Sequence, residues 1–110
     1  MRKAVNSPLE RHLQKTCLDY LKWLKARDPA LAFRKRHGSA MQTAGDPDLY
    51  GVWHGIPFEF ELKRPGHTLT LLQASRLQEW AQAGAVTAVV RSFEDLKAAL
   101  TEVQQKINPR

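Results

Sequence analysis

Apolar residues recur along the chain at two spacings, one typical of helices and one typical of strands. From position 8 to about position 26 they return every three or four residues, at Leu9, Leu13, Cys17, Tyr20, Leu21 and Leu24. The same spacing follows Ser92, at Phe93, Leu96, Leu100, Val103 and Ile107. We therefore predict an opening and a closing helix, each with one apolar face on the core. Ser7, Pro8 and Glu10 form a capping-box pattern that begins the first helix.

Strand-like segments lie between these two helices. Residues 30–36 could form a short strand, while residues 48–54 and 56–63 flank Gly55 and predict a hairpin with a tight turn at His54-Gly55. A second capping box at Thr70-Leu71-Leu72-Gln73 predicts a helix that reaches Ala83 and stops at Gly84. The nearly continuous apolar run at 85–91 is typical of a buried strand, joined to the hairpin by a crossover. The expected fold is α/β, with a small mixed sheet of about four strands flanked by helices.

Length and charge narrow the possible functions. The 110 residues suit one domain, 1–110, and 17 Lys and Arg against 11 Asp and Glu give a net charge of +6. This excess favours a polyanionic partner such as nucleic acid, although many basic domains bind nothing specific. No apolar run reaches the length of a membrane span, and no apolar segment follows Met1-Arg2-Lys3, so we expect a cytoplasmic protein without a membrane partner. The single Cys17 excludes an intrachain disulfide.

Residues that could bind a metal or take part in catalysis lie on the second strand of the hairpin. Because alternate side chains of a strand share a face, Phe58, Phe60 and Leu62 should point into the core and Glu59, Glu61 and Lys63 the other way. Asp48 begins the neighbouring strand and should come within reach of Glu61. Two convergent carboxylates suit Mg²⁺ or Mn²⁺, and such an ion with Lys63 beside it suits phosphodiester hydrolysis. The alternative is a cross-strand salt bridge with no chemistry.

The order of these motifs resembles the VRR-NUC family, a branch of the PD-(D/E)XK nucleases with a restriction-endonuclease-like core, related to Holliday-junction resolvases. The combined pattern is Gly45-Asp46-Pro47-Asp48-Leu49, then Glu61-Leu62-Lys63, then Gly66, Thr68 and Gln73; Pro47-Asp48 matches the first motif and Glu61-Leu62-Lys63 the second. The resemblance runs from Glu10 to about Ser92. It implies that Glu10, Asp48, Glu61 and the backbone carbonyl of Leu62 bind the metal, and that Asp48, Glu61, Lys63 and Gln73 form the catalytic set.

Several of these residues have simpler alternative roles. Glu10 and Gln73 each occupy the third position of a capping box and could serve only to bind backbone N–H groups. Gln73 also shares a helical face with Leu77 and Trp80, so its amide should need a polar partner near Lys63. Glu59 is expected to pair with a nearby Arg or Lys, and Asp46 to cap a turn.

A cluster of basic residues suggests where the phosphate backbone of a nucleic acid could bind. The residues expected to contact nucleic acid are Arg34, Lys35, Arg36, Arg64 and His67. A plain solvated charge run is the alternative.

These features together predict a metal-dependent DNA endonuclease that prefers branched DNA, such as Holliday junctions, and acts as a homodimer. A chain of this size has no room for a separate recognition domain, so the shape of the DNA must do the selecting. Candidates for an apolar dimer interface are Trp23, Tyr50, Trp53 and Trp80, each of which could equally be core. The rival functions are a non-catalytic basic nucleic-acid-binding module and a protein-interaction domain.

Overall fold

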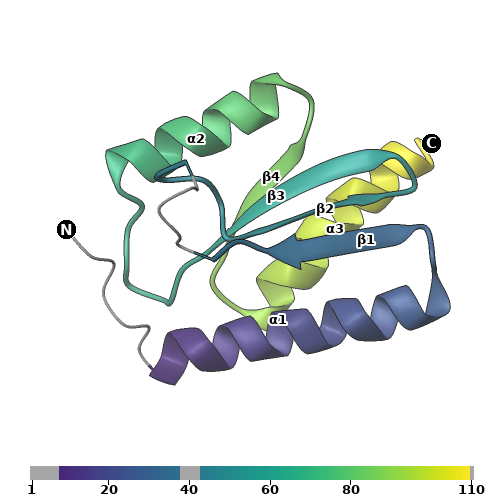
Figure 1. Cartoon of the computed structure of the whole chain (residues 1–110), viewed down its shortest axis with the longest axis horizontal. Coiled ribbons are helices and arrows are strands. Elements are labelled where there is room, and N and C mark those ends of the chain that lie inside the picture. The colour runs from purple at the N-terminus through teal and green to yellow at the C-terminus, as the bar shows by residue number, and fades with distance from the viewer. Residues whose placement is uncertain (1–7, 38–42, 110) are drawn as a thin grey trace.

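Three helices and four strands follow one another in the order that the apolar pattern predicts (Figure 1). The computed structural model describes residues 8–37 and 43–109. The elements are α1 (Pro8–Arg27), β1 (Leu31–Lys35), β2 (Leu49–Trp53), β3 (Ile56–Leu62), α2 (Leu71–Gln82), β4 (Val86–Val90) and α3 (Phe93–Ile107). The Ser7 cap predicted for the first helix lies outside the described residues.

The strands form one mixed sheet in the order β1-β2-β3-β4. The β1–β2 and β2–β3 pairs are antiparallel, and β3 and β4 are parallel. A parallel pair requires a crossover, which α2 provides. The turn between β2 and β3 has positive φ at both His54 (48°) and Gly55 (83°), as a tight two-residue hairpin turn demands. This confirms the predicted hairpin and the βαβ-like connection.

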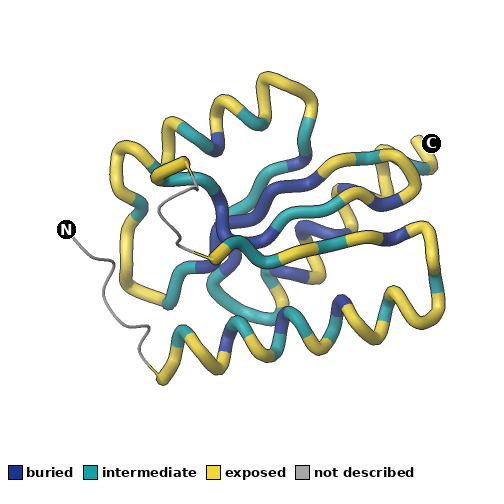
Figure 2. Tube along the Cα trace, viewed as in Figure 1, coloured by how far each residue is buried: buried dark blue, intermediate teal, exposed yellow. Residues whose placement is uncertain are grey.

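The core lies between one face of the sheet and the helices α1 and α3, and Figure 2 shows the buried positions concentrated along the central strands and the helix stripes that face them. The alternating residues Phe58, Phe60 and Leu62 all belong to this core, as predicted. On α1 the residues Leu13, Cys17 and Leu21 are buried. Leu9 is 65% exposed, so its predicted place in the core is wrong. It lies in the first turn of the helix, and a shared helical face does not by itself bring the end turn over the sheet.

The helix α2 packs against β3 and β4 on the other side of the sheet, where the side chains of Glu59 and Glu61 also point. Its capping box is complete, because the side chain of Thr70 accepts from the backbone N–H of Gln73 and the side chain of Gln73 accepts from that of Thr70. Gly84, with φ of 110°, follows the helix end as expected. Within the described residues, no helix combines the length and apolar character that a membrane span needs.

Candidate active site

The hairpin register brings the two motif carboxylates together at one end of the sheet. Leu49 pairs with Phe60, so Asp48 comes opposite Glu61. The backbone N–H of Leu62 donates to Oδ2 of Asp48 at 3.2 Å, which ties the first motif directly to the second. Both carboxylates are largely removed from solvent, with 9% of Asp48 and 3% of Glu61 exposed. Asp48 therefore lies beside the second motif, as expected.

Gln73 connects the second motif to the start of α2. Its Oε1 accepts from Nζ of Lys63 at 2.8 Å and from the backbone N–H of Thr70 at 3.0 Å. Its Nε2 donates to Oε2 of Glu61 at 3.1 Å. The polar partner expected for this amide near Lys63 is thus found, and the cap and the link to the motif are made by the same side chain. The cap bond therefore does not exclude contact with the second motif, and the part of Gln73 in a catalytic set stays a prediction.

Glu10 reaches the same place from the first turn of α1. A cavity of about 30 Å³ separates α1 from the strand ends. Because roughly 10–15 Å³ is enough to hold a water, the cavity has room for a small ion with a water ligand. Its walls are formed by residues from α1, β3, α2 and the segment before β2, namely Glu10, Leu13, Gln14, Asp48, Glu61, Leu62, Lys63 and Gln73. The cavity therefore collects every residue that the resemblance implied for metal binding or catalysis.

The donor set around this cavity fits a hard divalent cation. Carboxylate oxygens of Asp48 and Glu61 line it, with Glu10 at its α1 side, and such oxygens are the ligands that Mg²⁺ and Mn²⁺ prefer. Within residues 8–37 and 43–109, no three acidic, histidine or cysteine side chains stand close enough to enclose a metal ion by themselves. Mg²⁺ usually takes only one or two carboxylates and completes its octahedron with water and substrate phosphate oxygens. The residues fit an open site of that kind.

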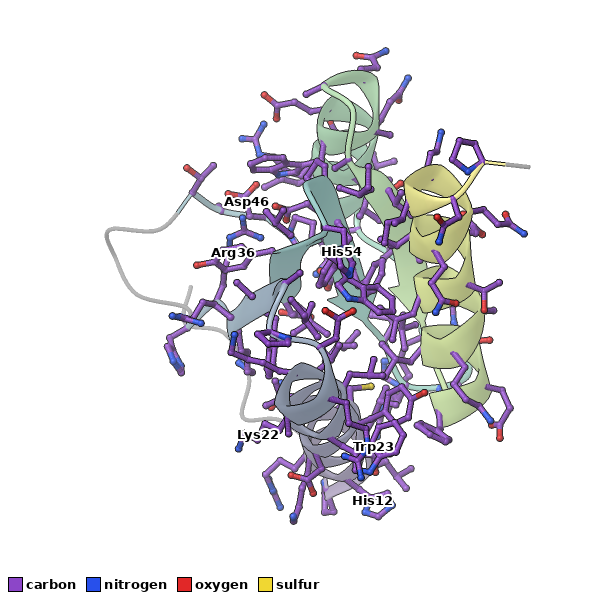
Figure 3. The ribbon with its side chains drawn as sticks, turned by 90° about the vertical axis from the view of Figure 1, so that its right-hand side faces the viewer. His12, Lys22, Trp23, Arg36, Asp46 and His54 are labelled. Carbon is purple, nitrogen blue, oxygen red and sulfur yellow. The ribbon has the colours of Figure 1, made fainter. Side chains whose placement is uncertain are left out.

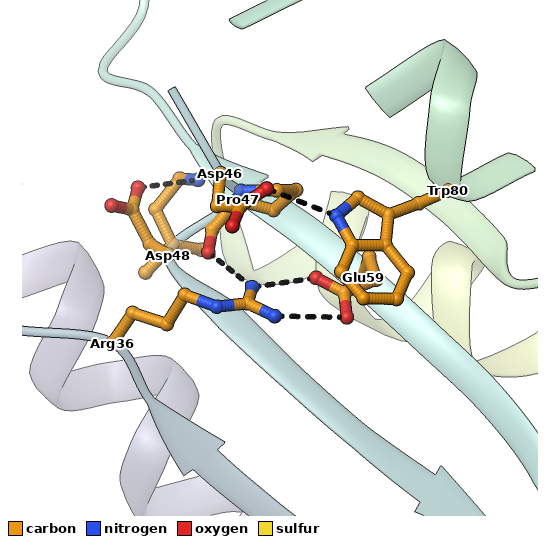
Figure 4. Close-up of polar contacts among 7 residues, drawn as sticks. Arg36, Asp46, Pro47, Asp48, Glu59 and Trp80 are labelled. Atoms are coloured by element: carbon orange, nitrogen blue, oxygen red, sulfur yellow. Dashed lines mark hydrogen bonds and ion pairs between the residues drawn. The ribbon is translucent and has the colours of Figure 1, made fainter. Parts of the chain in front are cut away.

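Glu59, two residues before Glu61 on the same strand face, belongs to a different cluster (Figure 4). Its carboxylate accepts from Nη1 and Nη2 of Arg36 at 2.6 and 3.1 Å, with 6% and 14% of the two side chains exposed. Burial raises the pKa of the Glu59 carboxyl above its ordinary value, and the bond from Arg36 opposes that shift. The expected salt bridge of Glu59 is present.

This pair changes the interpretation of the basic segment 34–36. Arg36 was predicted to contact nucleic acid, but its guanidinium is turned toward Glu59 and lies over the rings of Tyr50 and Trp80, at 4.1 and 5.5 Å. Strand alternation puts both Arg34 and Arg36 on the side of the sheet where Glu59 points, and Arg36 is the one that pairs with it. Arg34 is exposed and Lys35 is half-buried, with Nζ of Lys35 donating to the carbonyl of Arg36.

A second basic group lies beside the cavity, and sequence analysis found only part of it. Nε of Arg64 donates to Nε2 of His67 at 2.6 Å, and Nη2 of Arg91 donates to the carbonyl of His67 at 3.0 Å. Arg91 was not predicted. The available signal was topological, because parallel strands end at the same sheet edge, and Arg91 directly follows β4 as Lys63 and Arg64 follow β3.

The other singled-out side chains divide between core and surface. Trp53 is buried, and its Nε1 donates to Oδ2 of Asp28. Trp23 is half-exposed on α1, where Figure 3 shows it on the outer side of the helix with His12. Asp46 accepts from Nε1 of Trp80 at 3.1 Å, so it anchors the turn before the first motif to α2. Figure 3 places Asp46 beside Arg36, on the side of the sheet away from α3.

Comparison with known proteins supports the fold. No protein-family model matches the sequence, and no curated protein matches it. A solved structure described as a "VRR_NUC domain" matches with a TM-score of 0.69 at 22% identity, covering 86% of this chain and 97% of that one. Another, described as a "VRR_NUC domain protein", matches with a TM-score of 0.66 at 16% identity, covering 89% of each chain. The chain therefore has the fold of VRR_NUC domains, as the sequence resemblance predicted.

Proposed function

We propose that this protein is a metal-dependent nuclease that hydrolyses phosphodiester bonds in DNA. The observation that carries the proposal is the single cavity at the strand ends, where Asp48, Glu61, Lys63 and Gln73 meet Glu10 of α1. The shared fold supports it, because both matched structures are described as VRR_NUC domains.

The carboxylates of Asp48 and Glu61 would hold Mg²⁺ or Mn²⁺, with Glu10 and the backbone carbonyl of Leu62 as further oxygen donors. When bound, such an ion polarises the phosphoryl oxygen and lowers the pKa of water beside it. Asp48 would be kept in orientation by the N–H of Leu62, and Glu61 by the amide of Gln73. Fixed ligands of this kind favour binding because little side-chain freedom is lost when the ion enters.

Lys63 would stabilise the negative charge that develops on the phosphate. Its ammonium group lines the cavity and is held by Oε1 of Gln73 at 2.8 Å. A cation fixed before the reaction begins stabilises the transition state without first having to reorganise. Gln73 therefore acts through its neighbours: one end orients the Lys63 ammonium and the other orients the Glu61 carboxylate.

DNA would approach along the basic residues beside the cavity. Arg64 and His67 lie in the loop after β3, Arg91 joins them from the end of β4, and Arg34 and Lys35 lie on β1. The whole chain has a net charge of +6, and we expect these residues to bind the phosphate backbone rather than to read bases. Selection among DNA molecules would then depend on their shape, and we propose a preference for branched DNA such as four-way junctions.

We further propose that the active form is a homodimer, because paired cuts across a junction are most simply made by two sites related by a two-fold axis. Trp53 is buried and cannot serve as an interface residue. Trp23 is exposed, and Tyr50 and Trp80 line an open groove of about 450 Å³ on the sheet face beside α2. Light scattering at micromolar concentration measures the mass directly, and a stable monomer would refute this part.

The decisive experiment compares cleavage of four-way junction, flapped and linear DNA in Mg²⁺, Mn²⁺ or EDTA. We expect Asp48→Asn and Glu61→Gln to abolish cleavage while DNA affinity is kept or rises, because a metal ligand and a repulsive charge are removed together. Glu102→Gln on the exposed side of α3 removes the same kind of charge from a residue outside the cavity lining and should leave cleavage unchanged. A non-catalytic basic module would bind DNA in a salt-dependent way and cut none of the substrates.

A further inference from the structure

We propose that Arg36 is a positioning residue for Asp48, and that its ion pair with Glu59 fixes the segment Asp46-Pro47-Asp48 in the conformation that metal binding needs. The inference rests on the proposed function, because it assigns Asp48 a metal. It concerns a residue for which the sequence suggested a different role. Its basis is a cluster of contacts that joins Arg36, Glu59 and Trp80 to this one short segment (Figure 4).

Arg36 contacts the segment through both its backbone and its side chain. The backbone N–H of Arg36 donates to the carbonyl of Asp48 at 2.7 Å. Nη1 of the same residue donates to the carbonyl of Pro47, also at 2.7 Å. Two successive carbonyls are therefore held by one residue from another strand, and the backbone on either side of the Pro47–Asp48 bond has little freedom to shift.

The guanidinium is in turn fixed by Glu59 and two aromatic rings. Glu59 accepts from both terminal nitrogens, which sets the plane of the guanidinium, and the rings of Tyr50 and Trp80 lie against it. Trp80 also donates from Nε1 to Oδ1 of Asp46. The cluster consequently holds the residue before Pro47 as well as the carbonyls of Pro47 and Asp48.

The position of the Asp48 carboxylate follows from this backbone. Asp48 precedes β2, and on its β1 side its carbonyl accepts the bond from the backbone N–H of Arg36. Mg²⁺ and Mn²⁺ sites demand near-ideal octahedral geometry, and productive geometry tolerates displacements of only about 0.5 Å. If the Pro47 carbonyl lost its bond from Arg36, the Asp48 carboxylate could move away from Glu61. Metal affinity should therefore depend on the two terminal nitrogens of the Arg36 guanidinium, and not on a positive charge alone.

Two variants test the proposal without leaving a charge buried alone. Arg36→Lys keeps the cation for Glu59, but a single ammonium cannot span both carboxylate oxygens and the Pro47 carbonyl. The double variant Arg36→Met/Glu59→Gln removes both charges together and leaves the net charge unchanged, so the fold should be retained. Arg27→Lys is the matched control, because Arg27 also stacks on an aromatic ring, that of Trp23, and bonds a carbonyl far from the cavity.

The measurements are Mn²⁺ affinity of the DNA-free protein by calorimetry, the Mn²⁺ dependence of cleavage, DNA affinity in EDTA, and the melting temperature. We expect both Arg36 variants to bind Mn²⁺ roughly 10-fold more weakly than wild type and Arg27→Lys, with cleavage restored at high Mn²⁺ and DNA affinity unchanged. A lowered melting temperature with unchanged Mn²⁺ affinity would overturn the proposal and make the pair purely structural.

Two further outcomes would overturn it in different ways. If the variants bind Mn²⁺ normally but lose DNA affinity, with a salt dependence reduced by about one phosphate contact, Arg36 contacts DNA as the sequence suggested. If the wild-type protein itself neither binds Mn²⁺ nor cleaves, the proposed function fails, and this inference falls with it. A wild type that binds and cleaves beside unaffected variants refutes the role of Arg36 alone.

Discussion

The two roles of Gln73 can be separated by comparing Gln73→Leu with Thr70→Ala. Both variants break the same capping box, since each residue of the pair bonds the other's backbone N–H. Only Gln73 also bonds Lys63 and Glu61, at 2.8 and 3.1 Å. Thr70→Ala leaves those two bonds in place, because the Gln73 side chain and the Thr70 backbone are unchanged. It is therefore a control for the loss of the cap.

The magnitudes follow from the bonds that each change removes. Loss of an N-cap side chain costs about 1 kcal/mol, which lowers the melting temperature of a chain this size by roughly 4–8 °C. Gln73→Leu should lose a similar amount from the cap and about 1–2 kcal/mol more, because hydrogen bonds to charged groups are worth roughly 1.5–3 kcal/mol and these are half-buried. Their total of about 2–3 kcal/mol is a large part of the stability of a small domain.

The activities should differ far more than the stabilities. Removing a residue that orients metal ligands typically lowers activity or metal affinity by about 10–100-fold, so Gln73→Leu should cleave DNA at that reduced rate, while Thr70→Ala stays near wild type. Thermal melting and single-turnover cleavage at 20 °C, where both variants remain folded, measure the two effects. Equal activities of Gln73→Leu and Thr70→Ala would refute the reasoning and reduce Gln73 to a helix cap.

Three further predictions concern the rest of the fold. Cys17 is fully buried and its pKa is raised to about 11 by desolvation, so a thiol reagent at pH 8 should modify it only after unfolding, and rapid labelling of the native protein would contradict the packing of α1. A side chain at Gly51 would collide with the Ala32 carbonyl and approach Cζ of Phe58 at 2.6 Å, so Gly51→Ala should lower stability by about 2–4 kcal/mol in urea unfolding, and an unchanged midpoint would refute this. The pKa of Asp28 is lowered by its bond with His54, so the stability that Asp28 contributes is present above pH 3.8 and is lost as the pH falls through the lower folded-state pKa. The gap in melting temperature between wild type and Asp28→Asn should accordingly shrink below about pH 4, and a gap that widens on acidification would contradict the sign.

The order of the elements and the approach of Asp48 to Glu61 could be predicted from the sequence because each depends on local signals. The helices were predicted from the spacing of apolar residues and from capping patterns, and the hairpin was predicted from the His54-Gly55 turn. The register of that hairpin places Asp48 opposite Glu61. Gln73 was predicted to need a polar partner because its helical face is otherwise apolar. The match to VRR_NUC structures confirms the fold class and the resemblance, whereas the roles of the individual site residues stay predictions.

The pairing of charges could not be predicted in the same way. Arg34, Lys35 and Arg36 are consecutive cations, and nothing local distinguishes them. Strand alternation separates Lys35 from the two arginines, but Arg34 and Arg36 share the side where Glu59 points. Which of them pairs with Glu59 depends on how three strands are aligned, and that is set by the registers of two separate strand pairs. Arg91 was missed for a related reason. Its place beside His67 depends on the parallel pairing of β3 with β4, in which Glu61 is paired with Val89, 28 residues later, through the crossover of α2.

Glu59 and Glu61 illustrate how the surroundings, rather than the residue type, determine a carboxylate's role. Both are glutamates on one face of β3, both are buried, and they are only two positions apart. Glu59 accepts two hydrogen bonds from the guanidinium of Arg36. The positive charge of Arg36 balances the negative charge of Glu59, so little attraction for a further cation remains. Glu61 accepts a hydrogen bond from the amide of Gln73, and it lines the cavity with Asp48. The metal should therefore enter at Glu61, with Glu59 acting only through Arg36, and a Glu59→Gln variant should retain far more Mn²⁺ affinity than Glu61→Gln.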